Sequence, residues 1–267
     1  MSIEALIFDI DGTLADTEEA HRTAFNLAFE RFRLGWKWTR DDYRDLLRTT
    51  GGKERIVEYI KRLSLAEPER RRLRDLVADI HAEKTRLYSA VVGDGAVPFR
   101  SGVARLLDEA RDAGLRLAIA STTTAINVDA LLQANLGSRG LDMFSVIACG
   151  DQVRAKKPAP DIYRLALRHL GLPADRCVAF EDSPNGLRAA VAAGVWTVVT
   201  PTFWTEGGDF SGAALVLPSL GSPEQPLPSE PGHLLRAAAW LTLAELVDKA
   251  APAAKPDPVR SLYKVSS

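Results

Sequence analysis

This chain has few cysteines, no long apolar run and almost no net charge. Its 267 residues include only two cysteines, Cys149 and Cys177, and each lies at the end of an apolar run. Two separate thiols do not make a disulfide framework, so we expect both to be buried and reduced, as in a cytoplasmic protein. The net charge of −1 gives no sign of a nucleic-acid partner or of an anionic membrane surface.

Signals for membrane insertion or export are also missing. No apolar stretch reaches the length that crosses a bilayer, so we expect no membrane partner. The N-terminus lacks the basic segment of a signal peptide and enters an apolar strand almost at once. A hydrophobic content of 46% and a charged content of 26% are ordinary for a globular protein. The length allows one large domain, or one domain with a smaller insertion.

Hydrophobic periodicity divides the chain into three parts. Residues 3–10 predict a strand, residues 17–92 predict only helices, and strands and helices alternate from residue 101 onward. One helical stripe of the middle part runs from Leu73 through Leu76 to Leu87. The later strands are expected at 115–120, 144–149, 177–181, 195–200 and 215–217, and the later helices at 103–114, 126–136, 160–170, 184–193 and 240–250. This alternation predicts an α/β fold, a parallel sheet covered by helices on both faces, with a helical insertion after the first strand.

Two segments have a different composition. Residues 221–233 are rich in proline and serine and predict an extended surface loop. The chain from about residue 251 to residue 267 predicts a disordered tail.

Two acids end the first strand. Asp9 and Asp11 are separated by one residue, so their side chains point to the same side of the strand, and Gly12 allows a sharp exit. Two carboxylates this close repel unless a cation or a shared proton lies between them. Mg²⁺ suits such a pair, because it prefers one or two carboxylates plus phosphate oxygens of a substrate. An Asp-Gly turn at a strand end is the simpler alternative for such a short pattern.

Other polar residues follow the later strands, where ligands of open α/β sheets bind. Ser121 comes after the second strand and could donate to a phosphate oxygen or simply cap a helix. Lys157 precedes a proline, and its ammonium could neutralise Asp9 and a phosphate, or lie in solvent. Glu181 and Asp182 end the fourth strand, where Asp182 could serve as an N-cap.

The four strand ends together resemble the haloacid dehalogenase (HAD) superfamily of aspartyl phosphotransferases. The matching strings are FDIDGTL, the serine at 121, KPxPDIY and EDSxxG, in the order of the four motifs of that superfamily. The resemblance implies that Asp9 is the nucleophile and Asp11 the general acid/base, and that Ser121 and Lys157 bind the phosphoryl group. It also implies a Mg²⁺ site formed by Asp9, Asp182, Glu181 and the backbone carbonyl of Asp11. Residues 17–92 would form a helical cap domain, with residues 1–16 and 93–250 as the core.

The helical insertion contains three features that suit an anionic substrate. Glu18 and His21 share one helix face, as do His81 and Lys84. The glycine-containing loop at Thr50, Gly51 and Gly52 opens a helix and is followed by Lys53 and Arg55. Backbone N–H groups at a helix start, together with two cations, form an anion site. Each pair taken alone could be an ordinary solvated helix face. Together they provide more positive charge than one phosphate at Asp9 requires, which predicts a second phosphate on the substrate.

The strings TTGGKER, DIHxxK and STTT, with the helix KKPxPDIYRLAL, resemble the CbbY-like branch of the superfamily, over roughly residues 3–220. The resemblance implies a xylulose-1,5-bisphosphate phosphatase of carbohydrate metabolism, with substrate contacts from Thr122, Thr123 and Asn127. We expect a monomer, although nothing in the sequence determines the oligomeric state. A phosphosugar mutase of the β-phosphoglucomutase type and a phosphoglycolate-type monophosphate phosphatase are the enzymatic alternatives. A non-catalytic binding protein on this fold is disfavoured, because Asp9 and Asp11 are both intact.

Overall fold

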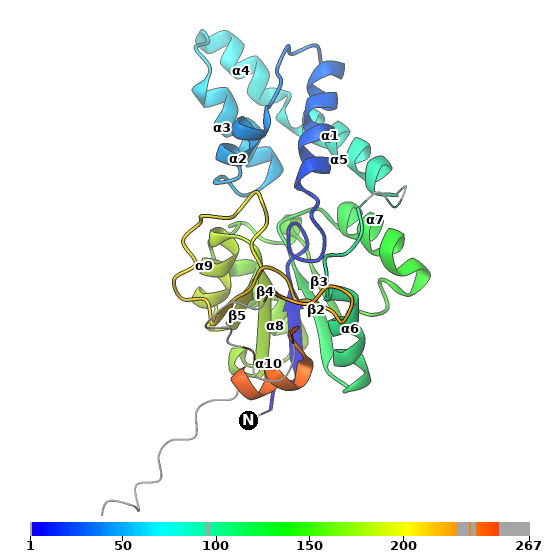
Figure 1. Cartoon of the computed structure of the whole chain (residues 1–267). Coiled ribbons are helices and arrows are strands. Elements are labelled where there is room, and N and C mark those ends of the chain that lie inside the picture. Colours follow the sequence, from blue (N-terminus) through cyan, green and yellow to red (C-terminus); the bar gives the residue numbers. More distant parts are fainter. Residues whose placement is uncertain (1, 94, 96, 229–234, 236–238, 251–267) are drawn as a thin grey trace, which may run out of the picture.

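Six parallel strands form the centre of the molecule (Figure 1). The computed structural model describes residues 2–93, 95, 97–228, 235 and 239–250; the expected tail at 251–267 lies outside these residues, as do 229–233 of the proline-rich segment. The strands are β1 (Ala5–Phe8), β2 (Arg116–Ala120), β3 (Val146–Ala148), β4 (Cys177–Glu181), β5 (Trp196–Val199) and β6 (Leu215–Val216). Their order is β3-β2-β1-β4-β5-β6, which places β1 between β2 and β4.

Helices cover both faces of the sheet. Side chains alternate along a strand, so Ala5 and Ile7 pack toward one face while Leu6 and Phe8 pack toward the other. The first face is covered by α8 (Asp161–Leu170) and α9 (Pro184–Ala192). The second face packs with α6 (Val103–Asp112), α7 (Ala125–Leu136) and α10 (Leu243–Ala250). The short 3₁₀ turns are Gly137–Arg139, Gly150–Gln152 and Ala174–Arg176. The predicted α/β class is confirmed.

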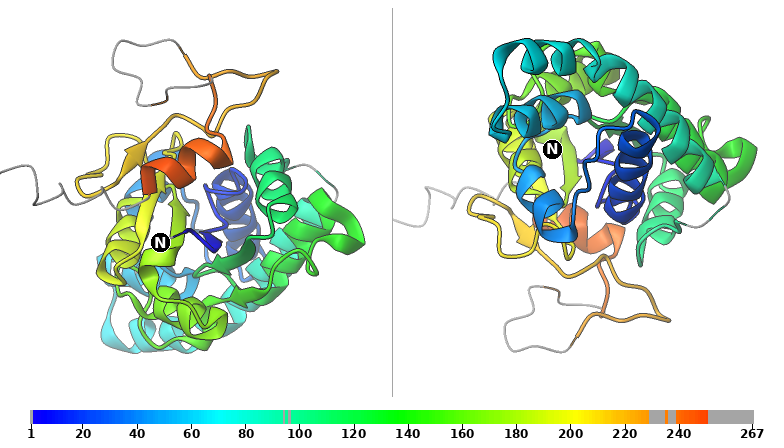
Figure 2. Two further views of the ribbon diagram at one scale, coloured as in Figure 1. Left: turned by 90° about the horizontal axis from the view of Figure 1, so that it is seen from below. Right: turned by 90° about the horizontal axis from the view of Figure 1, so that it is seen from above.

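The helical insertion lies over the carboxyl ends of the strands (Figures 1 and 2). It consists of α1 (Glu18–Arg31), α2 (Arg40–Leu46), α3 (Gly52–Arg62), α4 (Glu67–Asp75) and α5 (Val77–Gly93). Its centre is aromatic: Trp38 is fully buried and packs on Phe25 and Phe29, with ring centroids 4.8 Å away in both cases. The prediction that residues 17–92 are helical is confirmed, and these helices form a cap over the sheet.

The two segments that connect the cap to the sheet are paired. Ala15 forms an antiparallel bridge with Phe99, and the backbone N–H of Arg100 donates to the carbonyl of Leu14 over 2.8 Å. The guanidinium of Arg100 donates to the carbonyls of Gly12 and Thr200. The first connection is therefore held against the second and against the end of β5.

Several expected element bounds were too long. The stripe from Leu73 to Leu87 is divided at Leu76, where α4 ends and a new helix begins at Val77. The closing helix begins at Leu243 rather than Trp240, because the backbone N–H of Leu241 donates to Leu220 and holds this stretch extended. The described part of the proline-rich segment is only partly at the surface, since Gly221 and Leu227 are buried against Trp240. No described helix is long and apolar enough to cross a membrane.

Candidate active site

A cavity of about 720 Å³ lies between the strand ends and the cap. All predicted site residues except Glu181 line this cavity. They form two groups, one from the sheet side and one from the cap, which are distant in the chain. Those from the sheet side are Asp9, Asp11, Ser121, Thr122, Thr123, Asn127, Lys157 and Asp182, and those from the cap are Glu18, His21, Thr50, Gly51, Gly52, Lys53, Arg55, His81 and Lys84. Glu181 is fully buried behind this wall.

Lys157 joins two buried acids. Its ammonium donates to Oδ1 of Asp9 and to Oε1 of Glu181, each over 2.7 Å. Burial opposes the charge of Lys157, but the attraction of Asp9 and Glu181 outweighs it and raises the pKa of Lys157 above its ordinary value. Burial raises the pKa of Glu181 to about 7, against the opposing effect of Lys157. Tyr163 adds a hydrogen bond of 2.5 Å to the same Glu181 oxygen.

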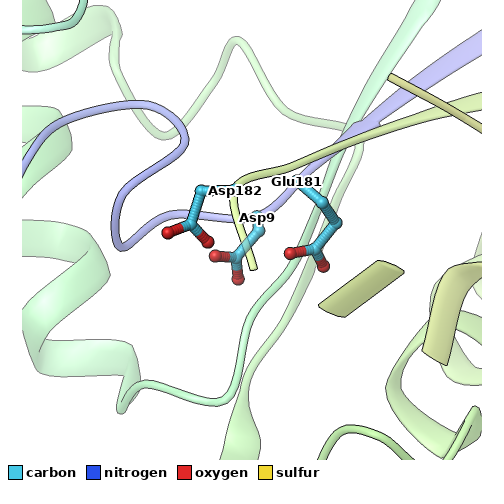
Figure 3. A group of neighbouring side chains, drawn as sticks. All are labelled: Asp9, Glu181 and Asp182. Atoms are coloured by element: carbon cyan, nitrogen blue, oxygen red, sulfur yellow. The ribbon is translucent and has the colours of Figure 1, made fainter. Parts of the chain in front are cut away.

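Asp9, Glu181 and Asp182 form an acidic cluster (Figure 3). One carboxylate oxygen from each residue lies within 4.8 Å of those of the other two. Glycines make this approach possible. A Cβ on Gly12 would lie 2.2 Å from Oδ2 of Asp182, and a Cβ on Gly186 would lie 1.8 Å from Oε2 of Glu181. Gly12 also has φ +83°, which other residues rarely adopt.

The acidic cluster fits a divalent metal ion. Lys157 supplies one positive charge against three buried carboxylates, which leaves a deficit of two charges. Burial, together with the nearby Asp9 and Glu181, raises the pKa of Asp182 well above its ordinary value. Oε2 of Glu181 is buried and has no hydrogen-bond partner among the described residues. Carboxylate oxygens in this number suit a hard cation such as Mg²⁺.

Asp11 belongs to a different network from the acidic cluster. Its Oδ1 accepts a hydrogen bond from Thr17 over 2.6 Å and lies 2.9 Å from Nε2 of His21. Lys84 lies 2.6 Å from Nδ1 of the same imidazole, so an ammonium there leaves the imidazole proton on Nε2, facing Asp11. Tyr88 stacks on His21 with a centroid distance of 4.0 Å.

The charges in this network affect one another. Burial alone would raise the pKa of Asp11, but attraction to His21 and the hydrogen bonds from His21 and Thr17 hold it below its ordinary value. Burial lowers the pKa of Lys84 to about 7. The Asp11 carboxylate is therefore kept ionised and is tied to the cap.

The loop after β2 presents hydroxyl and amide groups to the cavity. Ser121 is buried, and its Oγ accepts from the backbone N–H of Thr123 over 3.3 Å. Asn127 donates to Oγ1 of Thr123 over 2.9 Å, while its own Oδ1 is buried with no hydrogen-bond partner among the described residues. This cavity wall therefore combines hydroxyl groups with one buried amide oxygen that has no partner among the described residues.

The glycine loop of the cap closes tightly over its neighbours. Gly51 has φ +97° just before α3 begins, and a Cβ on Gly52 would lie 2.4 Å from Nε2 of His81. Burial, with the charge of Lys84 next, lowers the pKa of His81 to about 3. His81 is therefore neutral near pH 7, and it contributes hydrogen-bonding capacity rather than positive charge.

Arg55 forms its side-chain contacts within the cap domain. It donates to the hydroxyl of Tyr43 over 2.8 Å, and Tyr43 donates to Oε2 of Glu18 over 2.7 Å. Arg55 and Glu18, which were both expected to bind the substrate, are therefore linked to each other through Tyr43. Tyr43, Thr17 and Tyr163 were all missed as site residues. Tyr163 lies in the quoted string KPxPDIY, which could have flagged it, whereas Thr17 and Tyr43 lie in no quoted string.

The fold and the site define a hydrolase of the haloacid dehalogenase type. The family model of haloacid dehalogenase-like hydrolases matches residues 3–194, so the chain belongs to this family. It is 50% identical to the plasmid-encoded protein CbbY of Cupriavidus necator over 91% of this chain and 95% of that protein. The chain is therefore a phosphatase of the CbbY-like branch, as the sequence predicted.

Solved structures agree with this assignment. The crystal structure of CbbY from Rhodobacter sphaeroides in complex with phosphate is 49% identical in sequence to this protein and matches its structure with a TM-score of 0.76. The match covers 81% of the present chain and 94% of the CbbY chain. A mutant of the same protein, in complex with xylulose-1,5-bisphosphate, has 48% identity and the same TM-score and coverage.

Proposed function

We propose that this protein is a Mg²⁺-dependent phosphatase that removes one phosphate from xylulose-1,5-bisphosphate or a similar sugar bisphosphate. The observation that carries the proposal is the composition of the cavity. It places the carboxylate of Asp9 and the cap cations Lys53 and Lys84 around one space of about 720 Å³. The complex of a 48% identical relative with xylulose-1,5-bisphosphate supports the same substrate here.

The reaction proceeds in two steps in this proposal. The carboxylate of Asp9 attacks phosphorus and forms an aspartyl-phosphate. Asp11 protonates the leaving sugar oxygen and then takes a proton from the attacking water. The low pKa of Asp11 in its present network means that it must leave Thr17 and His21 to become a proton donor.

Protein groups stabilise the charge on the transferring phosphoryl oxygens. Lys157 supplies an ammonium beside Asp9, and Ser121 supplies a hydroxyl. Backbone N–H groups near Gly12 and Thr122 contribute donors in the same region. Mg²⁺ would be held by Asp9, Asp182 and the Asp11 carbonyl, with Glu181 assisting, and when bound it supplies positive charge to the phosphoryl oxygens.

The second phosphate of the substrate binds to the cap. Lys53 and Lys84 supply positive charge there, and the neutral His81 and the N–H groups of the Thr50–Gly52 loop supply hydrogen bonds. We also propose that residues 17–92 act as a cap domain that moves over a core formed by residues 1–16 and 93–250.

Phosphate release from purified protein tests the proposal. Xylulose-1,5-bisphosphate should be turned over with a much higher kcat/KM than xylulose-5-phosphate or phosphoglycolate. A parallel assay with a sugar 1-phosphate should show no transfer to the 6-position. Interconversion of sugar phosphates without net phosphate release would identify a mutase. Equal kcat/KM for bisphosphate and phosphoglycolate would identify a general monophosphate phosphatase.

A further inference from the structure

Asn185 links the core to the glycine loop of the cap. It lies in the first turn of α9, three residues after Asp182. Its amide Nδ2 donates to the carbonyl of Arg48 over 3.0 Å and to Oγ1 of Thr50 over 2.8 Å. One core side chain therefore binds two residues, Arg48 and Thr50, of the cap loop formed by residues 48–53.

The orientation of this amide is fixed from the other side. Arg188, one helical turn further along α9, donates to Oδ1 of Asn185. An arginine cannot accept a hydrogen bond, so the acceptor end of the amide faces Arg188 and the donor end faces the cap. The Arg48 carbonyl is an acceptor only, which requires the same orientation.

The cap loop has little freedom once these bonds are made. Gly51 occupies a backbone conformation at φ +97°, and Gly52 lies directly against His81. Lys53 follows at the start of α3 and lines the cavity. A displacement of Arg48 and Thr50 would therefore also displace the N–H groups and the ammonium that face the ligand.

Asn185 lies to one side of the cap connections. Those connections pair at Ala15 and Phe99, whereas Asn185 belongs to α9, which lies at the left of the core in Figure 1. A contact at the side away from the connections controls the angle of the cap more strongly than one beside them. Arg44 adds a second contact on this side, because its guanidinium donates to the carbonyl of Glu206 over 3.1 Å.

We propose that Asn185 is a positioning residue that closes the cap loop over the substrate, with Arg188 orienting its amide. The kinetic test of this inference rests on the substrate given in the proposed function, whereas the hydrogen-exchange test does not. Asn185 does not contact the reacting atoms in this proposal. It sets where Thr50–Lys53 lies when the phosphate that is not transferred binds.

The substitution Asn185→Asp keeps the shape of the side chain and removes its ability to donate hydrogen bonds to the cap loop. A carboxylate keeps the size and still pairs with Arg188, but it cannot donate to the Arg48 carbonyl, and the two acceptors repel. Glu206→Gln is the matched control, because it weakens the neighbouring core–cap ion pair, in which Arg44 lies 3.6 Å from the Glu206 carboxylate, and leaves both hydrogen bonds of Asn185 in place.

Hydrogen exchange of the full-length protein without substrate is the first measurement. The amides of residues 48–54 should exchange at least about 5-fold faster in Asn185→Asp than in wild type, and at the wild-type rate in Glu206→Gln. Exchange of these amides at the wild-type rate in Asn185→Asp would overturn the proposal. This result does not depend on which sugar phosphate the enzyme uses.

Kinetics on two substrates is the second measurement. In Asn185→Asp, kcat/KM for xylulose-1,5-bisphosphate should fall about 5- to 150-fold, the effect of losing two ordinary hydrogen bonds. For para-nitrophenyl phosphate, which has no second phosphate for the cap loop to bind, the fall should stay below about 3-fold. An equal fall on both substrates would overturn the proposal, since it would indicate damage to the metal site next to α9. If wild type fails on the bisphosphate, the proposed substrate is wrong, and hydrogen exchange alone decides the role of Asn185.

Discussion

Lys157 and Asp9 are 148 residues apart in the chain, yet Nζ of Lys157 lies 2.7 Å from Oδ1 of Asp9. Both side chains are almost completely buried. The contact therefore favours the charged form of Asp9 and also contributes to the folding of the core, because removing one partner leaves a buried charge unpaired.

Replacement of this lysine should have a large effect on stability. Lys157→Met should lower the free energy of unfolding by about 3–5 kcal/mol, because Asp9 and Glu181 lose their shared cation. Urea unfolding in the presence of a chelator measures this change. Added Mg²⁺ should recover part of the loss, since it replaces a positive charge at the same acids. A change below about 1 kcal/mol without metal would contradict the role of Lys157 as counter-ion.

Asp11→Asn should impair catalysis without impairing metal binding. Asparagine can still accept from Thr17 and lie beside His21, but it cannot transfer a proton. We expect kcat to fall about 10²- to 10⁴-fold, the usual contribution of a general acid/base. Steady-state kinetics at several Mg²⁺ concentrations measures both properties. A wild-type pH–rate profile in this variant would show that another group carries the proton.

Mg²⁺ should be required for turnover and should stabilise the fold. At a concentration 100 times its Kd, the ion should raise the free energy of unfolding by about 2.7 kcal/mol, because only the folded chain brings Asp9, Glu181 and Asp182 together. Ca²⁺ should support turnover poorly, since its bonds are longer and its coordination looser. Thermal unfolding and phosphate release with each ion test this, and full activity in excess chelator would contradict it.

Lys53 and Arg55 should differ when each is replaced by alanine. Lys53→Ala should lower kcat/KM for the bisphosphate about 10- to 150-fold, the range of one charge-assisted contact, and leave a small monophosphate nearly unaffected. Arg55→Ala should lower turnover of both substrates, because Arg55 also supports Tyr43 inside the cap. If both variants affect only the bisphosphate, Arg55 is a ligand-binding residue rather than a support of the cap.

His81 should make the fold sensitive to acid. Burial, then the charges of Lys84 and Lys53, lower its pKa to about 3, whereas the unfolded chain titrates near 6.5. The unfolded state therefore binds more protons between pH 6.5 and 3, and stability falls as the pH decreases through this range. His81→Asn should lose less stability than wild type between pH 7 and pH 4, measured by urea unfolding. Equal losses would mean that His81 is not buried in its neutral form.

The sequence predicted the strand ends well because their chemistry is local. FDIDGTL and EDSPNG each combine an apolar strand, acids and a glycine within a few residues, and the pairing of β1 with β4 then brings Asp9 near Asp182. Element bounds were less accurate. Leu76 continues a helical stripe in sequence, but a single turn residue at this position separates α4 from α5, which apolar spacing does not reveal.

Contacts between cap helices were not predictable from spacing. The chain of hydrogen bonds from Arg55 through Tyr43 to Glu18 joins three helices, and its existence depends on how α1, α2 and α3 are rotated about their axes. The contact of Lys84 with His21 likewise depends on the packing of α5 on α1. Arg55, Glu18, His21 and Lys84 were expected at the site from their charges and shared helix faces, and those patterns do not reveal the contacts between helices.

The paired connections at Ala15 and Phe99 limit how the cap can move. Two connecting segments without mutual hydrogen bonds would let the cap twist and slide over the core. Two segments that are hydrogen-bonded to each other bend together. The remaining motion is a hinge rotation of the cap about these paired segments. Such a rotation moves the cavity-lining 48–53 loop more than the base of α1, and so it widens the cavity at the Thr50 side.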